Sequence, residues 1–350
     1  MQNTTKNIKT PRFIDIFAGI GGFRLGIEKA YGIDGACESK NDELQITNDK
    51  NLSNGNNLER TALTCVYSNE WDKYANLVYR RHYGECDNRD IRSVKSSEIP
   101  DFDLLCGGFP CQAFSVAGKR GGFDDTRGTL FFEVARILKE KQPRLLLLEN
   151  VKGLLSHDSG RTFKVILATL TELGYDVQWQ VLNSKNFGVP QNRERVYIVG
   201  HLRGTPRPEV FPLGNYSPKT PQELTTNQSQ GNRIYNPSGT SVTIASQAGG
   251  LGAKTGLYMV NDPSREKGLE DKNIFTLTGQ DKHRVYDGVQ IRRLTPIECE
   301  RLQGFPDGWT EYGVDGEKIS DTQRYKMMGN AVTTNVVTEV MRRLAHENKK

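Results

Sequence analysis

A cysteine directly after a strand-like run is the residue in this chain best suited to do chemistry. Cys111 lies in the run GGFPCQAFS of residues 107–115, and the apolar residues 102–106 before it predict a buried strand. The glycine pair and the proline end that strand, and open α/β sheets bind their ligands at the carboxyl ends of strands. A free cysteine is more often a small buried hydrophobe than a nucleophile, so Cys111 needs partners.

Other polar residues follow strand-like runs and could face the same reacting atom. Glu149 comes directly after the four leucines of residues 145–148, where it could act on a proton or simply cap the next helix. Arg193 and Arg195 alternate along an extended segment and so share one side of it. Their guanidinium groups could bind a carbonyl oxygen or a phosphate, or remain solvated at the rim of the sheet.

A glycine loop near the amino terminus predicts a nucleoside-binding turn. Residues 15–22 read DIFAGIGG, and their glycines would let a ligand approach the backbone closely. The dinucleotide fingerprint would need glycine at the position of Arg24, so NAD is disfavoured. A nucleoside without a pyrophosphate, above all S-adenosylmethionine, fits better. Glu70 and Asp90 would then hold ribose hydroxyls and the adenine amine, unless they are only surface acids beside a structural turn.

Alternating strand and helix patterns position these residues in the first two hundred residues. Strands are expected over residues 12–17, 63–67, 102–106, 145–148, 175–182 and 195–200, and helices over residues 23–30, 71–81, 130–140 and 162–173. This order predicts an α/β fold with a doubly wound, mainly parallel sheet covered on both faces. Residues 40–60, rich in Asn, Asp and Lys, predict a surface insertion.

The composition changes after residue 200 and predicts a second, smaller, irregular β-rich domain. Residues 201–291 are rich in Gly, Pro, Asn, Thr and Ser, with short strand-like runs at 241–244 and 274–277. Helical patterns return at residues 296–303 and 332–344. We therefore expect a large domain of residues 1–200 plus 321–350, a smaller domain of residues 201–291, and a bridge of residues 292–320.

Composition and charge narrow the class of protein. The 350 residues are 36% hydrophobic and 25% charged, and no apolar run approaches the length of about 20 residues that crosses a bilayer. The six cysteines form no C-x-x-C pair, which argues against a zinc site and a disulfide framework and favours a reduced, cytoplasmic compartment. A net charge of +5 is compatible with a polyanion partner.

In order and spacing, the motifs together resemble the C5-cytosine DNA methyltransferase family, in its bacterial restriction–modification form. The resemblance rests on Pro110-Cys111-Gln112, on Glu149-Asn150-Val151 and on the Gln-x-Arg-x-Arg run of residues 191–195. It covers most of the chain and is weakest over residues 201–291, where each member reads its own DNA site. It implies a sheet of the S-adenosylmethionine-dependent methyltransferase type with a separate target-recognition domain.

The resemblance also implies a reaction. A cytosine is flipped out of a short specific duplex site, and the Cys111 thiolate adds to its carbon 6. Glu149 acts at N3 and Arg195 binds O2, with Arg193 beside them as a further catalytic residue. The methyl group of S-adenosylmethionine passes to carbon 5, S-adenosylhomocysteine is the product, and no metal takes part.

Further residues and partners follow from the same resemblance. It assigns cofactor binding to Phe17, Gly19, Ile20, Gly21, Gly22, Glu70, Trp71, Asp90, Ile91, Pro110, Leu130, Asn330 and Val332. It implies DNA contacts from Ser115, Lys119, Arg120, Gln191, Lys254 and Arg284. The expected partner is double-stranded DNA, with a cognate restriction endonuclease acting separately and no membrane. We expect a monomer in the bacterial cytoplasm or nucleoid.

Other functions remain open on the sequence. An RNA (tRNA) cytosine-5 methyltransferase would use the same fold, and an orphan or phage enzyme would look the same. A catalytically silent DNA-binding homologue would have no need of Cys111, Glu149 and Arg195 together. A nicotinamide oxidoreductase is the weakest alternative, because Arg24 breaks its fingerprint.

Overall fold

A computed structural model describes most of the expected large domain and short pieces of the region after it. The described residues are 11–32, 63–110, 130–213, 234–235, 241–242, 257–261, 284–286, 289–292 and 294–347. Several sequence predictions fall outside them: Cys111, Ser115, Lys119, Arg120, Lys254, the insertion of residues 40–60 and the strand of residues 274–277.

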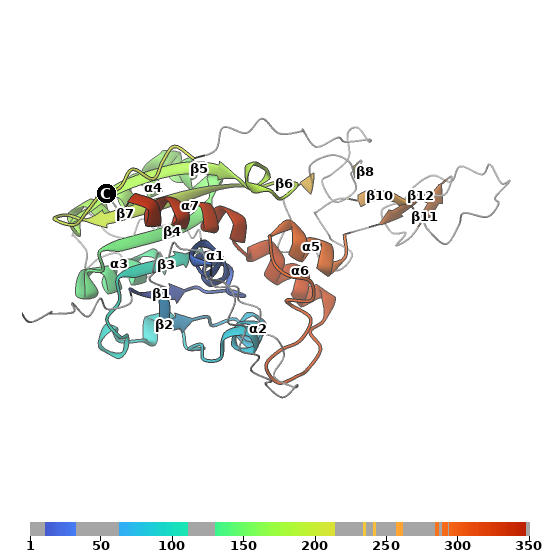
Figure 1. Cartoon of the computed structure of the whole chain (residues 1–350), viewed down its shortest axis with the longest axis horizontal. Helices are drawn as coiled ribbons and strands as arrows, with labels where there is room; N and C mark the ends of the chain where they lie inside the picture. Colours follow the sequence, from blue (N-terminus) through green and yellow to red (C-terminus); the bar gives the residue numbers. More distant parts are fainter. Residues whose placement is uncertain are drawn as a thin grey trace, which may run out of the picture.

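A six-stranded sheet forms the centre of the described chain (Figure 1). Its strands, in sheet order, are β2 (Thr64–Asn69), β1 (Arg12–Ile16), β3 (Leu104–Gly108), β4 (Leu145–Val151), β7 (Glu194–Leu202) and β5 (Tyr175–Asn183). Neighbouring strands are parallel except at β7, which runs antiparallel to both β4 and β5. The sequence prediction of a mainly parallel sheet is confirmed, and the near-continuous apolar run of β4 is typical of a strand buried on both faces.

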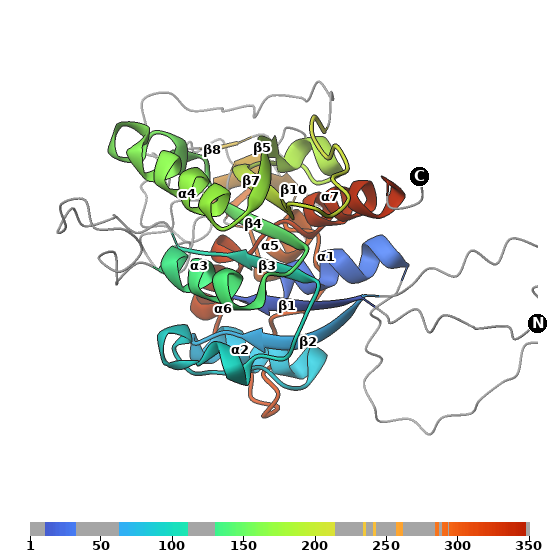
Figure 2. The same cartoon turned by 90° about the vertical axis from the view of Figure 1, so that its left-hand side faces the viewer.

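Helices cover both faces of this sheet. Figure 2 shows α3 (Leu130–Lys141) and α4 (Arg161–Glu172) on one side, and α1 (Gly22–Tyr31) and α7 (Thr334–Glu347) on the other. The helices α1 and α7 touch closely, because a Cβ at Gly26 would lie 2.6 Å from the Cβ of Val337. None of the described helices is long and apolar enough to cross a membrane.

Three more helices pack beside the carboxyl ends of β1 and β2. They are α2 (Lys73–Tyr83), α5 (Pro296–Leu302) and α6 (Asp321–Asn330). The sequence did not predict α6. Its buried side includes Arg324, so no continuous apolar stripe marks it as a helix. The chain thus returns to the sheet through α6 before α7 covers it.

Short 3-10 segments and small strands complete the described structure. The 3-10 segments are η1 (Ile91–Ser93), η2 (Ser96–Glu98), η4 (Lys152–Leu155), η5 (His157–Gly160) and η6 (Ser184–Phe187). A second sheet has the order β11 (Arg284–Tyr286), β12 (Val289–Arg292), β10 (Leu257–Asn261), β8 (Ile234–Tyr235), and β6 (Gln191–Asn192) pairs with β9 (Ser241–Val242). The β9 strand matches part of the predicted run at 241–244. The division into domains stays a prediction.

A buried histidine on β7 makes the stability of this sheet depend on pH. His201 is 1% exposed, and neither ring nitrogen has a hydrogen-bond partner within the described part of the chain. Burial lowers the pKa of His201 to about 4, because the charged imidazolium would lose its hydration. The folded state therefore binds this proton less readily than the unfolded state, whose histidine has a pKa of about 6.5.

We expect the free energy of unfolding to fall as the pH drops from 6.5 towards 4. The His201 contribution should amount to about 2 kcal/mol between pH 7 and pH 5. Urea unfolding at the two pH values would measure it, with His201→Phe as the comparison. The variant should lose that part of the pH dependence; an equal fall in both proteins would show that other groups cause it.

Candidate active site

The loop between β1 and α1 is bent by residues in the left-handed region. Phe17, Gly19 and Gly21 have φ values of 55°, 56° and 86°. A Cβ at Gly21 would collide with the ring of Tyr83, whereas a Cβ at Gly19 would meet nothing within 4 Å. Glycine is therefore required at position 21, and the backbone at position 19 stays open to a ligand.

The end of β2 supplies a carboxylate and an aromatic face beside this loop. Glu70 is 8% exposed, and its two carboxylate oxygens accept the backbone N–H groups of Gly19 at 2.8 Å and Asp72 at 2.7 Å. Burial raises the pKa of Glu70, and the two backbone hydrogen bonds oppose that rise. Trp71 follows with 67% of its surface exposed. The arrangement can hold hydroxyl groups and stack on a planar ring.

The remaining predicted cofactor residues surround the same end of the sheet. Asp90 precedes η1 and pairs with Arg92, which lowers the pKa of its exposed carboxyl group. Ile91 is buried beside it. Pro110 follows β3 as an exposed residue, Leu130 begins α3, and Asn330 ends α6.

The carboxyl-terminal part of the chain closes the loop from the other side. A Cβ at Gly22 would lie 2.7 Å from Cγ1 of Val332, so these two residues are in close contact. The sequence predicted that the chain returns to the cofactor loop after the bridge, and this contact agrees with it. Ile20 and Gly22 are both buried at the start of α1.

An ion pair between β4 and β7 lies at the centre of the predicted catalytic site. Glu149 Oε1 is 3.1 Å from Nε of Arg195, and both side chains are largely buried. The two residues meet because β7 is antiparallel to β4, with Val151 opposite Arg195. Burial raises the pKa of Glu149, and the nearby Arg195 and Arg193 only partly oppose the rise. The result is a carboxyl group suited to hold a proton, held in place by a guanidinium group.

Asn150 fixes the backbone that leads to Cys111. Its Nδ2 donates to the carbonyl oxygen of Phe109 at 2.8 Å, and its Oδ1 accepts the N–H of Val151, also at 2.8 Å. The sequence analysis placed Asn150 in a motif but predicted no function for it. Its position at the end of β4, beside the end of β3, was the available signal.

Replacing Asn150 should lower catalysis more than stability. In Asn150→Ala the Phe109 carbonyl loses its donor, and the chain before Cys111 can leave its productive position. We expect the single-turnover rate of the reaction at this site to fall about 10- to 100-fold. Asn335→Ala is the matched control, because Asn335 Nδ2 makes the same kind of bond to the Phe187 carbonyl at 2.9 Å, away from this site. Equal losses in the two variants would contradict a positioning role for Asn150.

Arg193 lies deeper than a residue that faces an open pocket. It is 2% exposed, and its Nη2 donates to the carbonyl oxygens of Gly329 at 3.0 Å and Ala331 at 2.8 Å. Burial and the nearby Arg195 lower the pKa of Arg193 to about 9. These contacts favour a positioning role for Arg193, because they join β7 to the segment that carries Asn330 and Val332.

Gln191, which the sequence predicted to contact DNA, lies in the interior of the described chain. Gln191 is fully buried, and its Nε2 donates to the carbonyl oxygen of Leu302 at 2.8 Å, so its side chain ties β6 to the end of α5. Among the other predicted DNA contacts, Arg284 begins β11.

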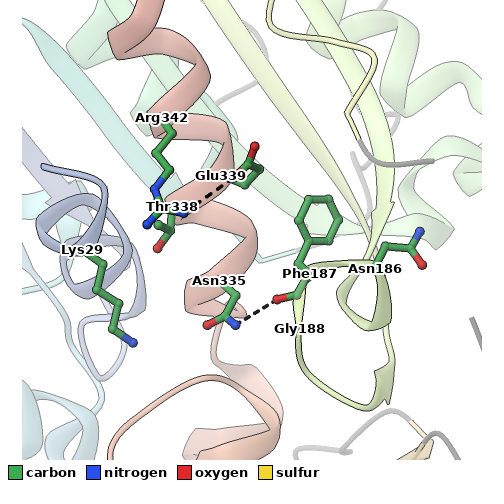
Figure 3. Close-up of a pocket in the computed structure, with 8 residues that line it drawn as sticks. All are labelled: Lys29, Asn186, Phe187, Gly188, Asn335, Thr338, Glu339 and Arg342. Carbon is green, nitrogen blue, oxygen red and sulfur yellow. Dashed lines mark hydrogen bonds and ion pairs between the residues drawn. The ribbon is translucent and has the colours of Figure 1, made fainter. Parts of the chain in front are cut away.

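A hollow of about 550 Å³ lies apart from this group, between α1, α7 and η6 (Figure 3). Its lining residues are Lys29, Asn186, Phe187, Gly188, Asn335, Thr338, Glu339 and Arg342. None of the predicted site residues lines it. The described residues also contain no cluster of three or more His, Cys, Asp or Glu that could hold a metal ion.

Comparison with known proteins identifies the family. The family model described as C-5 cytosine-specific DNA methylase matches residues 11–346. Type II methyltransferase M.NgoBI of Neisseria gonorrhoeae is 41% identical over 344 residues, covering 96% of this chain and 95% of that protein. Type II methyltransferase M.HhaI of Haemophilus parahaemolyticus is 35% identical over 369 residues, covering 95% and 93%. The chain belongs to the C-5 cytosine-specific DNA methylase family.

Solved structures agree at the level of the fold. The S. pombe Dnmt2 methyltransferase has a TM-score of 0.65 at 18% identity, covering 97% of this chain and 99% of that one. The Entamoeba histolytica methyltransferase EhMeth has a TM-score of 0.63 at 18% identity, covering 98% and 100%. The predicted α/β fold and the predicted enzyme class, a DNA (cytosine-5-)-methyltransferase, are both confirmed.

Proposed function

We propose that this enzyme methylates carbon 5 of one cytosine within a short specific sequence of double-stranded DNA, using S-adenosylmethionine. The observation that carries the proposal is the buried Glu149–Arg195 pair at the strand end next to the one that leads to Cys111. In that arrangement the carboxyl group could donate a hydrogen bond to N3 of a cytosine ring and the guanidinium group could donate to O2. The cysteine would add to carbon 6 of the same ring.

The glycine loop fits the proposed cofactor. Gly19 has open space where a Cβ would lie, Glu70 holds the loop through its carboxylate, and Trp71 leaves an indole face exposed. In this proposal Glu70 accepts hydrogen bonds from the ribose hydroxyls, Trp71 stacks on the adenine, and Asp90 accepts a hydrogen bond from the adenine amine. Phe17 and the glycines contact the methionine part, and Val332 closes the pocket. S-adenosylmethionine supplies an electrophilic methyl group for carbon 5, with S-adenosylhomocysteine as product.

The remaining steps fall to residues of the chain. The target cytosine leaves the base stack, because carbon 6 cannot be reached inside the duplex. The Cys111 thiolate forms a bond to carbon 6 and pushes the ring electrons towards carbon 5, while protonated Glu149 donates to N3 and Arg195 donates to O2. Once carbon 5 has taken the methyl group, N3 returns its proton to Glu149, and the proton of carbon 5 leaves to a base. The electron pair of that C–H bond then re-forms the ring double bond and expels Cys111 as thiolate.

Bisulfite sequencing tests the proposal directly. Mixed-sequence duplex DNA and bulk tRNA are incubated separately with the protein and S-adenosylmethionine. Protected cytosines in one short DNA context are the expected result. Methylation of tRNA alone would replace the proposal with an RNA methyltransferase, and DNA binding without methylation would indicate a silent homologue.

We further propose a cellular role as the modification enzyme of a restriction–modification system. The relatives named above are Type II methyltransferases, and this chain covers nearly their whole length. A cognate endonuclease would act separately on the same site in the bacterial cytoplasm. One duplex needs one cleft and one flipped base, so we propose a monomer, with residues 201–291 as the target-recognition domain.

A further inference from the structure

One side chain of the segment after α5, that of Trp309, contacts the cofactor loop. Trp309 is 5% exposed, and its indole Nε1 donates to the carbonyl oxygen of Ile20 at 2.9 Å. Ile20 lies between Gly19 and Gly21, the two glycines with left-handed backbone conformations. The sequence had given this bridge segment only a packing function between two domains.

Aromatic rings hold the indole of Trp309 in a fixed orientation. The imidazole of His82 stacks on it, with ring centres 3.5 Å apart and planes 5° from parallel. His82 Nε2 also lies 2.8 Å from the carbonyl oxygen of Trp309. The ring of Phe305 lies 5.5 Å away, and that of Tyr83, which packs under Gly21, lies 5.9 Å away. The indole N–H is therefore aimed at the loop by its own neighbours.

A buried ion pair fixes the turn that carries Trp309. The carboxylate of Glu300, on α5, is fully buried and accepts the backbone N–H groups of Gly308 at 2.7 Å and Thr310 at 2.9 Å, one on each side of Trp309. Arg324, on α6, donates to the same carboxylate at 3.1 Å. The position of Trp309 is thus set by α5 and α6 and not by the cofactor loop itself.

The glycine loop needs such an external restraint. Gly19 and Gly21 give its backbone access to many conformations, and a ligand that must first order the loop binds more weakly. Within the loop, one backbone hydrogen bond forms, from the Gly21 N–H to the Ala18 carbonyl oxygen at 2.9 Å. The bond from Trp309 restrains the carbonyl between the two glycines.

We propose that Trp309 is a positioning residue that holds the cofactor loop in its binding conformation and thereby sets the affinity for S-adenosylmethionine. This inference rests on the proposed use of that cofactor. Trp309 touches neither reacting atom, so its effect falls on cofactor binding and not on the chemical step. Glu300 and Arg324 act through Trp309.

Trp309→Phe tests this, because it keeps an aromatic ring and removes the N–H. We expect the Kd for S-adenosylmethionine, measured by calorimetry on the full chain, to rise about 5- to 20-fold. The KM for the cofactor should rise by the same factor, while kcat at saturating cofactor and the KM for DNA stay within about twofold. Tyr175→Phe is the matched control: it removes another buried donor to a backbone carbonyl, that of Pro143 at 2.8 Å, on the far edge strand. Its cofactor Kd should match that of the wild type.

An unchanged cofactor Kd in Trp309→Phe would overturn the inference, and so would a loss shared equally by kcat and the KM for DNA. If Trp309→Phe does not fold, Glu300→Gln serves instead, and a folded Glu300→Gln with wild-type cofactor Kd would overturn the inference as well. A wild-type chain that binds no S-adenosylmethionine would overturn the proposed function too. Wild-type binding with no change in the variant would overturn only the role of Trp309.

Discussion

Cys111→Ser is expected to abolish methyl transfer and leave the binding of cofactor and DNA intact. A serine hydroxyl is far less ionised than a thiol at neutral pH and is the poorer nucleophile towards carbon 6. The single-turnover rate with labelled S-adenosylmethionine should fall by about 10³-fold or more. A duplex that carries 5-fluorocytosine at the target should trap a covalent complex with the wild type and none with the variant, because fluorine cannot leave carbon 5 as a proton does.

Cys106→Ser is the matched control for that experiment. Cys106 is a fully buried thiol on β3 that donates to the carbonyl oxygen of Ile14 at 3.1 Å, and burial raises its pKa well above the ordinary value. A thiol of this kind is a poor nucleophile, so the change should leave the methylation rate within a few-fold of the wild type. Full activity in Cys111→Ser would remove Cys111 from the mechanism.

The sheet could be predicted from the sequence because its pattern is local. The leucines of β4 and the apolar residues of β3 mark strands without any knowledge of their neighbours, and the glycines of residues 19–22 mark the turn that follows β1. Strand ends were harder to place, since β3 and β4 both extend beyond their apolar runs to Gly108 and Val151. Backbone pairing, and not hydrophobicity, continues the strands there.

The site was less predictable, because its contacts join residues far apart in the sequence. No spacing reveals that Glu149 meets Arg195, since that contact depends on the antiparallel direction of β7. The burial of Gln191 could not be seen because glutamine is usually a surface residue. The burial of Arg324 could not be seen either, because its partner Glu300 lies on another helix.

Glu149→Gln should separate proton donation from simple hydrogen bonding at N3. The amide keeps the size of the side chain but cannot supply a proton, so we expect kcat to fall about 10²- to 10⁴-fold. Glu194→Gln is the control. Glu194 precedes Arg195 on β7, is exposed and pairs with Lys152 at 2.9 Å, so its replacement should change kcat less than twofold.

The pH dependence gives the sharper test of Glu149. Burial raises the pKa of this carboxyl group, so its protonated, active form persists at higher pH than for a solvated glutamate. Where Cys111 is ionised, the wild-type rate should therefore fall as the pH rises through that raised pKa. In Glu149→Gln the falling limb should disappear, because nothing at that position titrates. A variant that keeps both the wild-type rate and the falling limb would show that another group protonates N3, and that the Glu149–Arg195 pair only shapes the pocket.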